Sequence, residues 1–93
     1  MKKGIYKLHL NAGRNGTIEG IFVAYTLYVD TLLASKIRVY FGDVLGKHSE
    51  VDGEIEEDDI IEIKVSQSVI DELGCVFKDG NIIGYNPLEY IEE

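Results

Sequence analysis

Two apolar segments separated by an Asn-Gly dipeptide constrain the fold of this chain more than any other feature. Residues 5–10 alternate between apolar and polar side chains, which is typical of a half-buried strand. Residues 18–25 are apolar on both faces, which predicts a central strand of a sheet. Between them lies Asn15-Gly16, a dipeptide that favours the tight turn of a β-hairpin because both positions tolerate a positive φ. The sequence therefore predicts an antiparallel hairpin near the start of the chain.

The middle of the chain predicts one short helix and three further strands. Residues 26–35 have helical spacing of apolar side chains with Thr26 at the N-cap position, although their aromatic and β-branched content also fits a strand. We expect a helix there. Strands are expected over residues 37–41 and 60–65, and a short one over residues 51–55.

A second helix is expected to open after Ser66. Ser68 and Asp71 resemble a capping box, and Val69, Leu73 and Val76 are expected to form its buried edge. Cys75, on or just past this helix, is expected to be a small buried side chain.

The C-terminal part predicts a turn, a strand and a final helical turn. Residues 78–81 form a turn sequence, residues 82–85 fit a short strand, and Asn86-Pro87 is typical of an N-cap followed by proline at the first helical position. Together the elements indicate an α+β fold for residues 1–93 as a single domain. Its mainly antiparallel sheet has four to five strands and is accompanied by two short helices.

Composition points to a reducing compartment. The chain has a single cysteine, Cys75, which excludes an internal disulfide framework. The basic N-terminal residues are not followed by the apolar stretch of a signal peptide, and no apolar run reaches the ~20 residues of a membrane span. We expect a cytoplasmic protein.

Charge is unevenly distributed along the chain, whose net charge is −8. Residues 1–42 carry six bases and two acids, whereas residues 43–93 carry three bases and fifteen acids. This distribution fits solubility and attraction between the two halves, and it also fits an acidic face that meets a basic partner. Net acidity disfavours direct nucleic-acid binding but permits a small anion at a local basic spot.

Two polar glycine loops are the candidate ligand site. The stretch 42–54 contains Lys47, His48 and Ser49 between glycines, and the loop 11–17 contains Arg14 and Asn15. Backbone N–H groups of glycine loops converge on anions, and basic side chains complete the charge. The same residues also fit ordinary turns in which Lys47 and His48 pair with neighbouring acids.

Sets of residues for catalysis or metal binding are absent from the sequence. It contains no Walker A motif, no dinucleotide-binding glycine pattern, no His-Glu-x-x-His and no nucleophile elbow. We expect no metal and no cofactor. His48 alone could serve acid–base cleavage of a phosphodiester, so a small phosphodiesterase-like enzyme is retained as a second alternative.

A resemblance rests on three segments: KLHLNAGRNGT (7–17), VYFGDVLGKHSEV (39–51) and GYNPLEY (84–90). They resemble small, functionally unassigned proteins of bacteria and their phages. In size, acidity and lack of a catalytic set, the chain is also similar to phage accessory proteins of the anti-defence type. That resemblance implies either sequestration of a nucleotide signal or occlusion of a host protein's nucleic-acid-binding surface. A small acidic housekeeping protein has the same general features.

We therefore expect a non-enzymatic binding protein for a nucleotide or nucleotide-derived anion. The alternative is an inhibitor that presents acids to a basic host protein. The nine aromatic residues exceed what one small core needs, so we also expect a homo-oligomer. The acids assigned to the alternative interaction surface are Glu54, Glu56, Glu57, Asp58 and Asp59.

Overall fold

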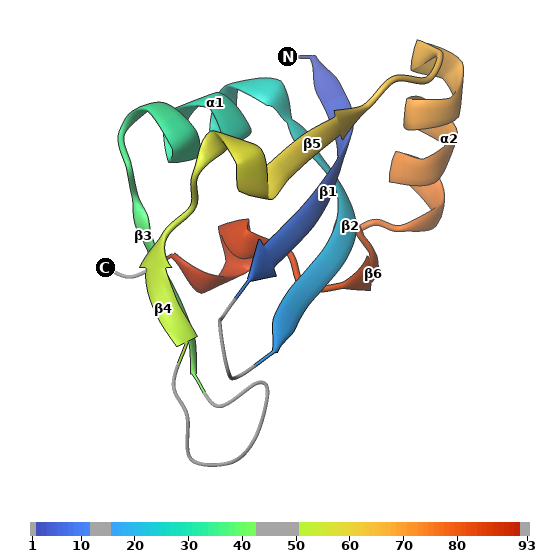
Figure 1. Ribbon diagram of the computed structural model, residues 1–93. Helices are drawn as coiled ribbons and strands as arrows, with labels where there is room; N and C mark the ends of the chain where they lie inside the picture. Colours follow the sequence, from blue (N-terminus) through green and yellow to red (C-terminus); the bar gives the residue numbers. More distant parts are fainter. Residues whose placement is uncertain (1, 12–15, 43–50, 92–93) are drawn as a thin grey trace.

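The computed structural model describes residues 2–11, 16–42 and 51–91 and has an α+β fold (Figure 1). Its strands are β1 (Lys3–Asn11), β2 (Thr17–Tyr25), β3 (Arg38–Gly42), β4 (Val51–Glu54), β5 (Ile60–Ile63) and β6 (Asn81–Gly84). Its helices are α1 (Thr26–Ala34) and α2 (Gln67–Val76), with 3₁₀ turns η2 (Glu57–Asp59) and η3 (Pro87–Tyr90). None of the helices in these ranges is long and apolar enough to cross a membrane.

The predicted fold class is confirmed, with a four-stranded antiparallel sheet in the order β5-β1-β2-β6. The two central strands pair over their full length, from Lys3 opposite Tyr25 to Asn11 opposite Thr17, as expected for the hairpin. Asn15 lies outside the described residues, and Gly16 has a φ of 106°. The strands β3 and β4 pair with each other and with no strand of the main sheet, so they form a separate ribbon.

One face of the sheet carries the main core. Alternate residues of β1 and β2 point to this face, where the rings of Tyr6 and Phe22 stack with their centroids 5.8 Å apart. Helix α1, the β3–β4 ribbon and η3 cover this face (Figure 1). The buried members are Tyr6, Leu8, Ile18, Phe22, Ala24, Val29, Leu32, Val39, Phe41, Ile55 and Ile60.

Helix α2 covers part of the opposite face, where Ile70 packs on Ile5 and Val23 (Figure 1). The predicted buried edge of this helix is wrong in register: Val69 and Val76 are exposed, and Ile70 is the buried residue. Cys75 is also exposed rather than buried. The cause is an ambiguous spacing, because positions 69, 73 and 76 fit a helical stripe as well as positions 70, 73 and 77.

Both helices begin differently from the sequence-based prediction. Helix α2 begins at Gln67, so Ser68 lies inside it, and Asp71 accepts a hydrogen bond from Gln67 Nε2 at 3.1 Å instead of completing a capping box. Thr26 is the first residue of α1 rather than its N-cap. Its backbone N–H and its hydroxyl both donate to the carbonyl of Lys2, at 2.9 and 3.1 Å. This pair of hydrogen bonds ties α1 to the start of the chain.

Two glycines allow β6 to turn onto the main-core face of the sheet. Gly84, opposite Gly20 in the ladder, has a φ of 71°, which favours glycine. The N–H of Tyr85 then donates to the carbonyl of Glu19 at 3.1 Å. A Cβ atom at Gly20 would collide with the backbone of Tyr85. Gly20 is therefore required for the close passage that brings η3 to the main core.

We expect Gly20→Ala to lower the free energy of unfolding by about 1–3 kcal/mol, because the added methyl group forces two backbone segments apart. Gly74→Ala is the matched control. A Cβ at Gly74 meets only the Lys3 ammonium at 3.9 Å, and replacing glycine within a helix stabilises it by up to about 1 kcal/mol. Urea denaturation measures both variants. Equal stabilities for Gly20→Ala and the unmodified chain would contradict the close passage.

Stability at alkaline pH depends on Tyr6. Burial, followed by the negative charges of Glu62 and Asp30, raises the pKa of its hydroxyl from 10.0 to about 12. Between these two pH values the folded chain keeps a proton that the unfolded chain releases. The free energy of unfolding therefore falls by roughly 2 kcal/mol as the pH rises through this window. In urea denaturation series, Tyr6→Phe is expected to lose less stability there, and an identical pH slope would contradict the assignment.

Candidate functional site

The side chains assigned to the ligand loops fall in the two stretches that the structure does not describe. Arg14, Asn15, Lys47, His48 and Ser49 all lie outside the described residues. Their binding roles stay predictions. The described residues instead present two other candidate sites, an acidic segment and a pocket.

The acidic segment spans Glu54 to Asp59, and its carboxylates differ in role. Glu54 ends β4 opposite Arg38 of β3. Asp59 stabilises the local structure, because its carboxylate accepts a hydrogen bond from the N–H of Glu56 at 2.9 Å. Asp59 is thus part of the turn around η2, whereas it was expected to contact a partner.

Glu57 and Asp58 are the acids most available to a partner. Both are exposed in η2, and neither forms an ion pair with a lysine or arginine within the described ranges. With Glu56 they line a shallow depression beside Lys36 and Leu33. The acidic face therefore exists as a surface feature, centred on the η2 turn.

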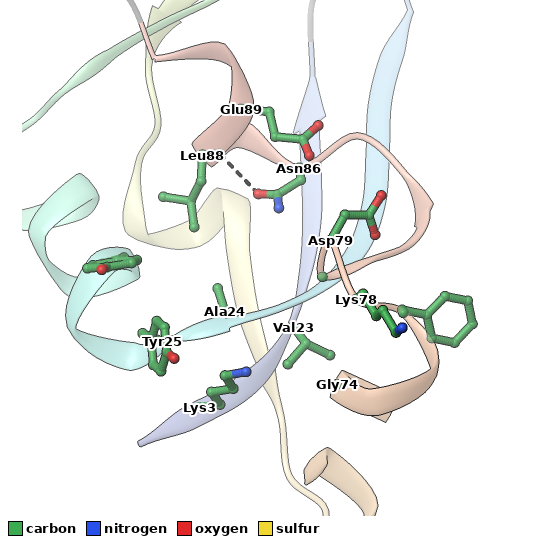
Figure 2. Close-up of a pocket in the computed structure, with 13 residues that line it drawn as sticks. Lys3, Val23, Ala24, Tyr25, Gly74, Lys78, Asp79, Asn86, Leu88 and Glu89 are labelled. Carbon is green, nitrogen blue, oxygen red and sulfur yellow. Dashed lines mark hydrogen bonds between the residues drawn. The ribbon is translucent and has the colours of Figure 1, made fainter. Parts of the chain in front are cut away.

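A pocket of about 290 Å³ lies between β1, β2, α1, α2, the turn after α2 and η3 (Figure 2). Lys3 comes from β1 and Tyr25 from the end of β2, and Tyr28 comes from α1. Helix α2 contributes Gly74, and η3 contributes Glu89. The volume is near the lower end of the range for small-molecule sites, ~300–1,000 Å³.

The turn after α2 forms one side of this pocket. The N–H of Phe77 caps the helix by donating to the carbonyl of Leu73 at 2.8 Å, and the N–H of Gly80 donates to the carbonyl of Phe77 at 2.8 Å. The carbonyl of Gly80 in turn accepts from the N–H of Val23 at 2.7 Å. The predicted turn at residues 78–81 is confirmed, and these bonds fix Lys78 at the pocket rim.

A hydrogen-bonded network forms the polar end of the pocket. Asn86, which is buried, accepts from the N–H of Leu88 at 3.0 Å and donates to Asn81 Oδ1 at 2.8 Å. Asn81 donates through Nδ2 to Glu89 Oε1 at 2.7 Å and through its N–H to Asp79 Oδ1 at 3.0 Å. The second oxygen of each carboxylate makes no further hydrogen bond within the described part of the chain. Both remain acceptors for a ligand.

The other end of the pocket is aromatic and cationic. Lys3 Nζ lies 5.0 Å from the ring centroid of Tyr25, and the rings of Tyr25 and Tyr28 meet edge to face at 5.3 Å. Figure 2 shows Lys3 and Tyr25 at one end and Asp79, Asn86 and Glu89 at the other. The pocket is therefore bipolar.

Neither Lys3 nor Lys78 forms an ion pair with a carboxylate among residues 2–11, 16–42 and 51–91. This is notable in a chain with 17 acids and 9 bases, where carboxylates outnumber the available cations. Gly74 leaves open space beside the Lys3 ammonium. The two ammonium groups are thus free to bind an anion.

Comparisons with known protein families, with curated proteins and with solved structures find no match to this chain. In the described ranges, no three metal-ligating side chains lie close enough to hold an ion. The pocket residues are spread from position 3 to position 89, so no local motif marks them. The only signals in the sequence were the 78–81 turn and the Asn86-Pro87 cap, which we interpreted as structural.

Proposed function

We propose that this protein binds a small nucleotide-like anion, without chemistry on it, in the pocket between β2, α2 and η3. One observation carries the proposal: two lysines that have no ion-pair partner among the described residues share a mononucleotide-sized pocket with two tyrosine rings. Ammonium groups bind phosphate oxygens as point charges, and the tyrosine rings beside Lys3 form the apolar wall of that end of the pocket. Sequestration of a nucleotide signal, as in phage anti-defence proteins, is the biological role that this binding would serve.

The bipolar arrangement supports a ligand with acceptors at one end and donors at the other. Phosphate oxygens suit Lys3, and the exocyclic amino group of a nucleobase suits the free carboxylate oxygens of Asp79 and Glu89. Asp79 and Glu89 are exposed, and their carboxylate oxygens are acceptors, so a base that carries an amino group gains a hydrogen bond here that uracil, which has no amino group, does not. The pocket therefore favours adenine, guanine or cytosine nucleotides.

We expect calorimetric titration to show binding of a nucleoside monophosphate that Gly74→Leu abolishes, because the new side chain extends into the pocket beside Lys3. The same substitution places a stronger helix former in α2, and circular dichroism verifies that the variant is folded. Val69→Leu is the control, since Val69 is exposed on the same helix and does not line the pocket. Absence of binding by every nucleotide tested, or full binding by Gly74→Leu, would refute the pocket as the site.

The contribution of phosphate is measured with Lys3→Met, which keeps the apolar stem and removes the charge. Affinity for the monophosphate is expected to fall about tenfold to a hundredfold, while affinity for the corresponding nucleoside changes little. Lys64→Met, a charge removed outside the pocket, is the control.

If Lys47→Ala abolishes binding and Lys3→Met does not, the ligand binds at the 42–54 loop. Recovery of intact nucleotide separates binding from phosphodiesterase activity.

A second candidate function is inhibition of a basic host protein by the acidic face. The exposed carboxylates of Glu57 and Asp58, without cationic partners in the described residues, favour it. Electrostatic association of this kind weakens as salt screens the charges.

To test this candidate, Glu57 and Asp58 should be changed together to lysine, leaving Asp59 in place because it stabilises the turn. If the acidic face binds a basic host protein, the unmodified chain is expected to capture that protein from host lysate at low salt. Capture is expected to weaken at high salt and to disappear in the double variant. Gly74→Leu is expected to leave capture unchanged. Capture that survives the double reversal would rule out the acidic face.

A further inference from the structure

One of the two edges of strand β5 has no partner strand in the part of the chain that the structure describes. The strand pairs with β1 on one side and is the last strand of the sheet on the other. Ile61 is 59% exposed, and Val65 just beyond the strand is 42% exposed. Open edges with apolar side chains are templates for pairing with another strand, and natural proteins usually cover or block them.

The sequence of this edge alternates in a self-complementary way. Within β5, which ends at Ile63, Ile61 and Ile63 share one face of the sheet and Glu62 lies on the other. Lys64 and Val65 follow the strand and continue the alternation of apolar and charged residues in the sequence. Within one chain, Lys64 Nζ donates to Glu62 Oε1 at 3.3 Å, and both side chains are accessible to solvent. The segment thus carries one acid and one base at equal distances on either side of Ile63.

Antiparallel pairing of two copies about Ile63 matches every position. It places Ile63 opposite its own counterpart, Ile61 opposite Val65, and Glu62 opposite Lys64 in both directions. Directly opposite residues in an antiparallel pair interact, and opposite charges there are stabilising while like charges are destabilising. Pairing about Glu62 or about Lys64 would instead place two like charges face to face. Pairing about Ile61 would require residues of the η2 turn to pair as a strand. Charge complementarity and backbone conformation together therefore favour the register about Ile63, with a second copy of this chain as the partner.

The geometry points to a homodimer in which the β5 edges of two copies pair antiparallel about Ile63. Two four-stranded sheets then form one continuous eight-stranded sheet, with a closed two-fold interface. The opposite edge of the sheet is less suited. Strand β6 has a register irregularity in its pairing with β2 and ends at Gly84 in a positive-φ conformation. This interface is independent of the proposed ligand pocket.

Charge-swap variants in sedimentation equilibrium test the dimer. We expect the unmodified chain to dimerise. Glu62→Lys alone and Lys64→Glu alone are each expected to weaken dimerisation at least about tenfold, because each variant creates two like-charge pairs. The double variant E62K/K64E restores both opposite-charge pairs and is expected to restore the dimer.

Glu72→Lys is the matched control, an equal charge change at an exposed position of α2. It is expected to leave the association constant unchanged, and circular dichroism verifies that each variant is folded. A chain that stays monomeric up to about 1 mM, or a dimer in which E62K/K64E does not recover, would overturn the proposal.

The register is tested by cross-linking. In a Cys75→Ser background, Ile63→Cys is expected to form an intermolecular disulfide on mild oxidation, because directly opposite Cβ atoms lie about 4.5–5.5 Å apart. Ile61→Cys in the same background is the control, since its two copies would be separated by about 13 Å along the strands. Equal cross-linking at both positions, or cross-linking only at residue 61, would exclude pairing about Ile63.

Discussion

The ladder between β1 and β2 is the interaction on which the rest of the structure depends. Its register runs without interruption from Lys3 opposite Tyr25 to Asn11 opposite Thr17. Every other strand of the main sheet attaches to one of these two, and both faces of the pair are covered by helix. A shift by one residue would exchange the faces that receive α1 and α2. The single register is thus fixed by apolar side chains on both sides of β2.

The sequence predicted the elements whose periodicity is local. The hairpin, the ribbon strands, both helices and the Asn86-Pro87 cap were predicted from patterns of two to ten residues. What escaped prediction depends on contacts between distant segments. Helix α2 has two equally good apolar stripes, and only packing on Ile5 and Val23 selects the one that contains Ile70. The pairing of β3 with β4 apart from the main sheet is equally a choice of tertiary partners.

The candidate site illustrates the same limit. Lys3 and Tyr25 become neighbours because they end the same ladder, and Glu89 reaches them because β6 pairs with β2 and the chain then turns at Gly84. None of these residues belongs to a motif, so composition directed attention to the glycine loops instead. The acidic segment was found from sequence because its charges are consecutive. The sequence did not show that Asp59 stabilises the turn while Glu57 and Asp58 face solvent. That difference became visible only from the hydrogen bond between Glu56 N–H and the Asp59 carboxylate.

The passage of Tyr85 over Gly20 also determines when the chain can complete its core during synthesis. Tyr85 and Tyr90 pack against Phe41, with ring centroids 6.0 and 4.9 Å away, and Ile91 forms a bridge with Val39. These last described residues emerge from the ribosome after every segment that they cover. Until then Phe41 and its neighbours lack their cover, and contacts of such long sequence separation form slowly. The nascent chain therefore exposes an aromatic surface that closes only after residue 91 has been released.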